Sequence, residues 1–386
     1  MKQVYLDHCA TTPLDPRVLE AMVPYYSGEY GNASSIHSYG RRARLALEES
    51  RERIANFIGA KPDELFFTSG GTESDNYAVV GVARASRKLQ RARIITTPLE
   101  HHAVLDPAEA LKSDGISVVS VHVNSEGLVD PNSVAAEIDD ATSLVSVVHA
   151  NNEVGTIQPL REIGTICRKR GVPFHSDAVQ SVGKIPVNVQ ELSVDLLSIS
   201  AHKIYGPKGI GALFIRKGTK IESFMKGGPQ ESNRRAGTEN IPLAVGFAKA
   251  VEICSHQMDH DAKGMLRLKL LLKEMIETAC EGVIVNGHPT LSLPNVLSIS
   301  FEARRASVDG EALIMGLDLR GIAVTSGSAC TSGSLQPSHV MLAMGRDEQT
   351  ARATIRFSLG RSTTEEEIVY TVDALKQVLQ TARKNK

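Results

Sequence analysis

The sequence predicts an α/β protein in which a large domain with a mainly parallel sheet is joined to a smaller α+β domain. Short apolar runs, typical of buried strands, alternate with helical segments over most of the chain, and this alternation is characteristic of parallel sheets. With 386 residues, the chain exceeds the size at which one hydrophobic core usually keeps growing. Two domains are therefore expected, and an apolar fraction of 42% is enough to fill both cores.

The chain begins with a segment, residues 1–12, that is expected to form an extended arm and to end in a turn before Pro13. A polar, glycine-led loop over 31–37 then precedes a helix over 41–58. The apolar residues of this helix are expected to lie close to one face, and Gly59 ends it. They are Leu45, Ile54, Phe57 and Ile58.

A strand over 64–68, two glycines and a helix that continues through residue 83 come next. The first turn of a helix carries unpaired N–H groups and the positive end of the helix dipole, and Gly70 and Gly71 let the backbone approach an anion closely. The segment therefore predicts a phosphate-binding site, although it is not the P-loop pattern. Thr72 could cap the helix, bind the phosphate, or do both.

The middle of the chain continues the alternation and places polar residues after its strands. His101 and His102 follow the first of these strands, Asn152 follows the third, and a helix over 160–170 comes after it. Polar residues at strand ends are candidates for a site, while a lone histidine is more often a surface residue. The strands are expected at 93–97, 117–121 and 143–148.

Lys203 stands between two apolar runs, 196–199 and 212–215. The chain between Lys203 and the second run is rich in glycine, so two buried strands around a tight turn are expected. A lysine at the end of a buried strand loses part of its hydration, which favours the neutral amine and makes it a candidate for Schiff-base formation. A solvated loop lysine is the alternative, and this stretch alone does not separate the two.

Asp177 ends another short apolar segment, and Gln180 follows three residues later. An acid fixed at a strand end can hold the ring nitrogen of pyridoxal phosphate protonated, which this cofactor needs in order to accept electrons. Lys203 and Asp177 together therefore predict a cofactor site.

The last third of the chain is expected to form the smaller domain. A polar, glycine-rich loop over 226–240 and a helix over about 243–280 lead into it. Helices are expected near 311–320 and 365–379. Short strands are expected at 283–285, 296–301, 322–324 and 354–358.

Several motifs together resemble the cysteine desulfurases of the NifS/IscS type. They are Ser-Ala-His-Lys at 200–203, Asp-Ala-Val-Gln at 177–180, Ser-Gly-Gly-Thr-Glu-Ser-Asp-Asn at 69–76 and Ser-Gly-Ser-Ala-Cys-Thr at 326–331. The similarity runs nearly end to end, from Tyr5 to Arg361, and long motifs in one order are more specific than any single one. His8 and Cys9 depart from the family's usual Asn-Ala, which leaves the contacts of His8 open.

The resemblance implies the type I fold of pyridoxal-phosphate-dependent transferases. It implies a large cofactor-binding domain over 16–260 and a small domain formed by 1–15 and 261–386, with a mobile loop at about 325–337. The reaction implied is conversion of L-cysteine to L-alanine, with the sulfur left as a persulfide on Cys330 and passed on to an acceptor protein such as an iron–sulfur scaffold. The physiological acceptor stays open.

The resemblance also assigns the cofactor contacts. Lys203 would form the Schiff base and move the substrate Cα proton, Asp177 would pair with the ring nitrogen, and Gln180 would reach the ring hydroxyl. His101, rather than His102, would stack on the ring and handle protons of the substrate thiol or the leaving alanine. Asn152 would lie beside the cofactor as well as the substrate. The phosphate would be held by Gly71, Thr72, Ser200, His202 and, from a second subunit, Thr238, which implies a homodimer.

Substrate binding is assigned to three residues, and sulfur transfer to one cysteine. Arg356 would clamp the substrate carboxylate with both arms of its guanidinium, beside Asn32 and Asn152. The residues alone also allow a structural salt bridge for Arg356 and a simple turn for Asn32. Cys330 lies among small residues, which fit a mobile loop that collects sulfur inside and delivers it outside. An ordinary thiol has a pKa near 8.5, so the site must assist its ionisation.

Composition excludes several other classes of protein. A formal charge of -1 indicates neither a nucleic-acid nor a membrane surface, and neither a long apolar stretch nor a signal-peptide pattern is found, so a cytoplasmic protein is expected. The five cysteines are widely spaced, which indicates neither a disulfide framework nor a metal site. The given sequence ends soon after the last expected helix, so scaffold binding through a longer C-terminal tail, as in some members of the family, is not expected.

Two rival functions stay open. A selenocysteine lyase or another class V pyridoxal-phosphate enzyme would share Lys203 and Asp177 without needing Cys330. A sulfur carrier that presents Cys330 without turnover would be a protein of another class, and a bound chromophore would argue against it.

Overall fold

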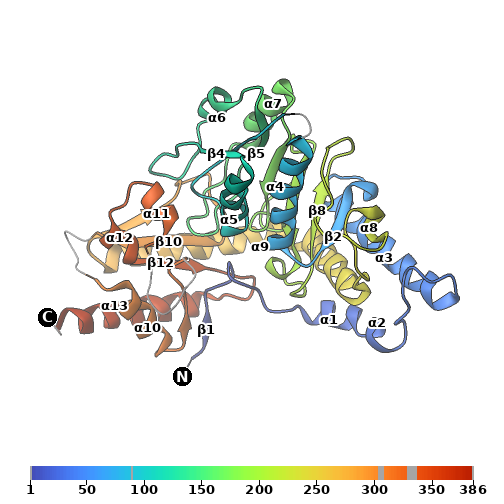
Figure 1. Ribbon diagram of the computed structural model, residues 1–386. Coiled ribbons are helices and arrows are strands. Elements are labelled where there is room, and N and C mark those ends of the chain that lie inside the picture. The colour runs from blue at the N-terminus through green and yellow to red at the C-terminus, as the bar shows by residue number, and fades with distance from the viewer. Residues whose placement is uncertain (1, 88–89, 303–307, 328–336, 385–386) are drawn as a thin grey trace.

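The computed structural model describes residues 2–87, 90–302, 308–327 and 337–384. A large part is built on a seven-stranded sheet, and a smaller part is built on a three-stranded sheet (Figure 1). The predicted α/β class with a mostly parallel sheet is confirmed. The exact domain limits, 16–260 for the large domain, remain a prediction.

The large sheet has the strand order β2-β8-β7-β6-β5-β3-β4. All neighbouring strands run parallel except β8, which is antiparallel to both β2 and β7. The turn between β7 and β8 is too short for the crossover that a parallel pair requires, so these two strands form a hairpin. The strands are β2 (Leu65–Thr68), β3 (Arg93–Thr96), β4 (Ser117–Ser120), β5 (Thr142–Ser146), β6 (Phe174–Asp177), β7 (Leu196–Ser200) and β8 (Gly211–Ile215).

Helices cover both faces of this sheet. Successive strand residues point to opposite faces, so Ile94 packs in the core beneath α4 and α5, while Ile95 packs in the core on the other side. The first core lies under α4 (Gly71–Arg87) and α5 (His102–Ala110). The second includes residues of α1 (Pro16–Met22), α3 (Ser38–Phe57), α6 (Pro131–Glu137), α7 (Leu160–Arg170) and the first half of α9 (Ile241–Ala279).

The prediction that Leu45 lies on the buried face of α3 is wrong. Leu45 is 61% exposed, whereas Ala43, Leu47 and Ile54 are buried. Residues spaced by three or four lie on one face of a helix, and Leu45 is two positions away from both Ala43 and Leu47. Leu45 therefore lies off the buried face of α3, and its side chain is exposed.

The smaller part has its own core around an antiparallel sheet of order β12-β10-β9. The N-terminal arm belongs to this part, because β1 pairs with β11 and Val4 and Leu6 are buried in the same core. The strands are β1 (Val4–Tyr5), β9 (Val283–Asn286), β10 (Val296–Phe301), β11 (Ile322–Ala323) and β12 (Thr354–Ser358). The helices packed on them are α10 (Gly310–Asp318) and α13 (Glu365–Lys384).

The 39-residue helix α9 joins the two parts. Its first half contributes Phe247 and Val251 to a core of the large sheet, and its second half contributes Leu268, Leu272 and Ile276 to the core of the smaller part. The remaining short helices are α2 (Pro24–Ser27), α8 (Gln230–Asn233), α11 (His339–Ala343), α12 (Glu348–Arg352), η1 (Pro62–Glu64), η2 (Leu111–Asp114) and η3 (Ala201–Lys203). Within the described ranges, no helix is both long and apolar enough to cross a membrane.

Candidate active site

A cavity of about 390 Å³ opens where the ends of β6 and β7 and the start of α4 meet residues of the smaller part. It brings together most of the residues predicted for the site, although they come from segments far apart in the sequence. Those that line it are Gly71, Thr72, His101, Asn152, Asp177, Gln180, Ser200, His202, Lys203 and Arg356.

Lys203 lies in η3, directly after β7, and its amine faces the N-terminal arm. Its Nζ donates hydrogen bonds to the carbonyl oxygens of Cys9 at 2.5 Å and Ala10 at 2.7 Å. Burial, together with the smaller effect of the Arg356 guanidinium, lowers the pKa of Lys203 to about 8, although the Cys9 thiol and the Asp177 carboxyl act in the opposite direction. A lysine with this pKa is partly neutral near physiological pH, as a nucleophile must be.

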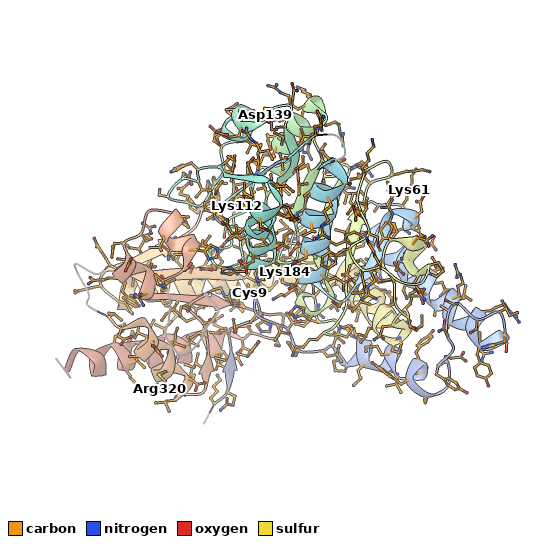
Figure 2. All side chains as sticks on the ribbon, viewed as in Figure 1. Cys9, Lys61, Lys112, Asp139, Lys184 and Arg320 are labelled. Carbon is orange, nitrogen blue, oxygen red and sulfur yellow. The ribbon has the colours of Figure 1, made fainter. Side chains whose placement is uncertain are left out.

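The backbone of Lys203 is fixed from two sides. The buried amine of Lys184 donates to the Lys203 carbonyl oxygen at 2.8 Å. Tyr205 has a left-handed backbone with φ +65°, and its N–H donates to Thr12 Oγ1 at 2.8 Å. Cys9 and Lys184 lie near each other in the middle of the molecule (Figure 2) and interact electrostatically. The arm and Lys184 therefore position Lys203 together.

Asp177 ends β6 and is buried at the base of the cavity. Its Oδ1 accepts a hydrogen bond from the Val179 N–H at 2.8 Å. Burial raises the pKa of Asp177. Burial also raises the pKa of Asp75, a second residue that lines the cavity, and repulsion from the Asp177 carboxyl raises it further. Oδ1 of Asp75 has no hydrogen-bond partner among the described residues. Among the described residues, neither carboxyl has a hydrogen-bonded cation, and His175, whose Nε2 lies 3.6 Å from Asp75 Oδ1, has a pKa lowered by burial to about 3 and is neutral. Two such buried carboxyls fit a ligand that brings a positive charge, such as a pyridinium nitrogen.

The other end of the cavity fits a phosphate group. Gly71 and Thr72 form the first turn of α4, where helix N–H groups are unpaired. A Cβ on Gly71 would lie 2.7 Å from Val179 Cγ2, so only glycine fits there. The buried hydroxyl of Ser200 has no partner among the described residues, and it also faces the cavity. The residues present thus match the two ends of pyridoxal phosphate.

Arg356 comes from β12 of the smaller part and is almost fully buried. Its Nη1 donates to the Asn152 carbonyl oxygen at 2.8 Å, and its Nη2 forms an ion pair with Asp7 Oδ1 at 2.8 Å. The salt bridge that the residues alone allowed is therefore present. Nε of Arg356 has no partner in the described part of the chain, so the guanidinium keeps a donor for a carboxylate.

Comparison with known proteins identifies the family. Residues 4–370 match the family model described as Aminotransferase class-V. The cysteine desulfurase IscS of Dictyoglomus turgidum is 48% identical over 99% of this chain and 96% of its own length, and the human cysteine desulfurase is 46% identical over 97% of this chain and 81% of its own. A solved NifS-like protein has a TM-score of 0.91 at 40% identity, covering 98% of this chain and all of its own. The chain belongs to the class V aminotransferase family.

Membership confirms three of the predictions made from sequence. The resemblance to NifS/IscS cysteine desulfurases is confirmed by the relatives, and the fold class by the solved structure. Class V aminotransferases depend on pyridoxal phosphate, so the cofactor prediction is confirmed as well. The role of each site residue stays a prediction.

The two adjacent histidines face different surroundings. His101 lines the cavity, and its Nδ1 accepts a hydrogen bond from the Ala103 N–H at 3.0 Å. Burial and the neighbouring Lys203 lower the pKa of His101, while Asp177 opposes the shift. His102 instead contacts Asp106 at 3.0 Å and packs its ring edge against His339. Of the two histidines, His101 is therefore the one that lines the cavity.

Two further predicted residues, Asn32 and Thr238, are described and do not line this cavity. Asn32 is exposed, and its Oδ1 accepts from the Ser34 N–H at 2.8 Å, which is the turn that the residues alone allowed. Thr238 is exposed and lines a separate cavity near Arg235. Cys330 and most of its loop lie outside the described residues.

Sequence reasoning missed several residues of the site. Cys9 supplies a carbonyl oxygen to both Lys203 and Gln180, and Asp7 pairs with Arg356. Both lie in the arm, whose departure from the family pattern at His8 and Cys9 was the only available signal. Asp75 lies within the recognised motif 69–76, but nothing local marked it as buried. In the described ranges, no group of three or more metal-ligating side chains that could hold an ion is found.

Proposed function

We infer that this chain is a pyridoxal-phosphate-dependent cysteine desulfurase, which converts L-cysteine to L-alanine and transfers the sulfur to Cys330. The observation that carries the inference is the meeting of Lys203, Asp177 and Arg356 around one cavity. Relatives named cysteine desulfurase match nearly the whole chain. The bound cofactor would serve as the electron sink for bonds broken at the substrate amino acid.

Residues of the large part would hold the cofactor. Lys203 binds it covalently and, once released by the substrate amine, moves the proton at the substrate Cα. Asp177 stays ionised against the ring nitrogen, Gln180 reaches the ring hydroxyl, and the ring of His101 covers one face. The phosphate is held by the start of α4, Ser200 and His202, with Thr238 of a second subunit.

Arg356 and Asn152 would bind the substrate. The two residues are already joined, since the Asn152 carbonyl oxygen accepts a hydrogen bond from Arg356. A guanidinium that is held on two sides presents its free donor in one direction, which orients the carboxylate of a small amino acid. Asn32 is exposed and is not among the residues that line the cavity, so the proposed substrate contact does not include Asn32 of the same chain.

Sulfur transfer requires the Cys330 thiolate. In the proposed reaction the C–S bond of cysteine breaks, and its electron pair stays with the carbon fragment, which is protonated and leaves as alanine. The sulfur forms a new S–S bond with Cys330, so the thiol becomes a persulfide that a reductant or an acceptor protein can discharge. His101 handles the protons of this exchange.

The test is to incubate the protein with L-cysteine and to measure alanine and sulfide, with and without a thiol reductant. One added sulfur, about 32 Da, is expected on the Cys330 peptide and should disappear on reduction. Cys330→Ala should lose sulfur transfer, and Cys167→Ala is the matched control, because Cys167 is a buried cysteine of α7. Full alanine production by Cys330→Ala would favour a selenocysteine lyase or another class V enzyme.

The proposal extends to assembly, partners and compartment. Thr238 is exposed and outside the cavity, as expected for a residue that completes the site of a second subunit, and exposed apolar side chains such as Tyr30, Ile36 and Leu45 support a homodimer interface. Cys9, Cys167 and Cys254 are free thiols, which fits the reducing cytoplasm. The IscS name of a relative supports an iron–sulfur scaffold as acceptor.

A further inference from the structure

A layer of buried polar side chains lies between α4 and the large sheet, beside the cavity. His175 and Asp177 alternate on β6 with Phe174, which packs in the core on the other face, so both point toward α4. Asp75 of α4 meets them there, since its Oδ1 lies 3.6 Å from His175 Nε2. Ser198 of β7, the strand partner of Asp177, belongs to the same layer. Asp75, His175 and Ser198 are all buried.

The hydrogen bonds of this layer run in one direction, toward Asp75. Burial lowers the pKa of His175 to about 3, so its ring is neutral and carries one N–H. The Ser198 hydroxyl hydrogen-bonds the Asp75 carboxyl, so its oxygen accepts from His175 Nε2, which lies 3.0 Å away. Nδ1 of His175 then accepts from the Ser146 hydroxyl at 2.8 Å. The chain from Ser146 to Ser198 thus offers Asp75 a donor without a positive charge.

The ionisable groups that face Asp75 are mainly carboxyls. Burial raises the pKa of Asp75 most, and the carboxyls of Asp177 and Glu100 raise it further. Burial also raises the pKa of Asp177, although the nearby His101 and Lys203 act in the opposite direction. Because each of two neighbouring carboxyls disfavours ionisation of the other, Asp75 and Asp177 titrate as a pair.

We propose that Asp75 is a positioning residue that acts through Asp177: the two carboxyls hold one proton between them in the cofactor-free protein and release it when the protonated ring nitrogen binds. This rests on the proposed contact between Asp177 and that nitrogen. The pair changes from one proton to none, and the proton passes to solvent, or to the nitrogen if it arrives unprotonated. Asp75 lines the cavity and its Oδ1 has no hydrogen-bond partner in the described chain, so its negative charge faces the ligand. Two carboxylates then hold the ring nitrogen protonated more firmly than one.

The number of protons exchanged on cofactor binding tests this pair. Cofactor-free wild type and Asp75→Asn are titrated calorimetrically with pyridoxal phosphate in two buffers of different ionisation enthalpy. Asp75→Asn has no pair proton to release, so it should take up about one proton more per cofactor than wild type. Ser198→Ala keeps the carboxyl but removes its donor, and should give an intermediate number. Equal numbers in wild type and Asp75→Asn would overturn the proposal.

Infrared difference spectra of cofactor-loaded against cofactor-free protein identify the carboxyl that loses the proton. A C=O band of a protonated carboxyl should disappear on loading in wild type, and no such loss is expected in Asp75→Asn. Glu100→Gln is the matched control and should keep the loss of the band. Glu100 is a buried carboxyl that accepts from Thr97 Oγ1 at 2.7 Å and the Val148 N–H at 2.9 Å, but it does not line the cavity. A band change abolished by Glu100→Gln and kept in Asp75→Asn would overturn the proposal.

Nitrogen-15 NMR of cofactor labelled at the ring nitrogen separates this proposal from the proposed role of Asp177. In Asp75→Asn the nitrogen should lose its proton at a pH about one unit lower than in wild type, and in Asp177→Asn at a still lower pH. An effect of Asp177→Asn alone would leave the Asp177 contact standing and overturn the role of Asp75. No effect of Asp177→Asn would remove that contact and this proposal with it. These measurements use no L-cysteine, so they do not depend on sulfur transfer to Cys330.

Discussion

Lys203 shows how its surroundings make an ordinary side chain reactive. The amine is partly buried, lies near the cationic Arg356, and donates to two carbonyl oxygens of the arm. Burial and the neighbouring cation disfavour the charged form, whereas the carbonyl oxygens orient it. The same lysine on an exposed loop would stay protonated at neutral pH.

The pKa of Lys203, about 8, predicts a pH dependence for cofactor capture. Only the neutral amine attacks an aldehyde, so the capture rate of cofactor-free protein should rise about tenfold per pH unit below 8 and level off above it. Stopped-flow absorbance after mixing with pyridoxal phosphate measures this rate. Lys269, whose pKa is also lowered to about 8 but which donates to Ser292 and Leu293, provides the control. Lys269→Gln should keep the wild-type profile, and a profile that shifts with it would contradict the assignment.

Replacing Arg356 should affect the substrate more than the cofactor. Losing a charged contact to a carboxylate costs about 1.5–3 kcal/mol, so Arg356→Ala should weaken L-cysteine binding roughly ten- to hundredfold. Spectroscopic titration with L-cysteine measures the affinity, and titration with pyridoxal phosphate should show little change. Arg216→Ala removes an arginine that contacts Val189 and Val194 outside the cavity and should leave both affinities intact. Unchanged cysteine affinity in Arg356→Ala would assign Arg356 a structural role through its contacts with Asp7 and Asn152.

Helix α9 shows how one element serves two cores. Its first half packs on the large part and its second half packs on the smaller part. The helix therefore holds the two parts in one relative orientation. Glycine inside a helix lowers stability unless packing requires it. In α9, close packing leaves no room for a side chain at Gly246, whereas the space around Gly264 is open.

The two glycines predict opposite effects of an added methyl group. Gly264 is exposed with open space around its Cβ position, so Gly264→Ala should stabilise the protein by about 0.5–1 kcal/mol. On Gly246, a Cβ would lie 2.6 Å from Met22 Sδ, and Gly246→Ala should destabilise it by about 1–3 kcal/mol. Equilibrium unfolding in urea measures both free energies. If both variants changed the free energy of unfolding in the same direction, the close packing of Met22 on Gly246 would be contradicted.

At the scale of the whole molecule, the site forms where the two parts meet. Lys203 and Asn152 belong to the large part, whereas Arg356 and the arm belong to the smaller one. The arm crosses to the large part, where Thr12 bonds the His202 carbonyl oxygen and Gln180 bonds that of Cys9. A site divided in this way is complete only when both parts are folded and docked.

The proposed dimer extends this division to a second subunit. Thr238→Ala should weaken cofactor binding about tenfold, which is the expected effect of losing one phosphate contact. Lys203→Ala should be inactive. Mixed dimers of the two variants would contain one fully wild-type site if Thr238 acts across the interface, so they should have about half the wild-type activity. Below cofactor saturation, Thr238→Ala should have low activity, and if Thr238 served its own subunit, mixed dimers would keep only half of it. Alanine production by co-expressed, doubly tagged dimers distinguishes the two.

The sequence by itself determined the local features of this protein. Several elements follow from apolar runs and periodicity, which depend on neighbours along the chain. They are the strand before Lys203, the strand that ends in Asp177, helix α7 and the long helix α9. The motifs also assigned the family, because their order and spacing are specific.

Only the tertiary structure decided which distant residues meet. The carbonyl oxygens of Cys9 and Ala10 lie on Lys203, Asp7 pairs with Arg356, and Glu153 contacts both Gly327 and Ser338. The exposure of Leu45 and Asn32 was likewise decided by packing. Periodicity records which face of an element is apolar, but contacts between segments far apart in sequence depend on how the two parts dock, and no local pattern encodes that arrangement.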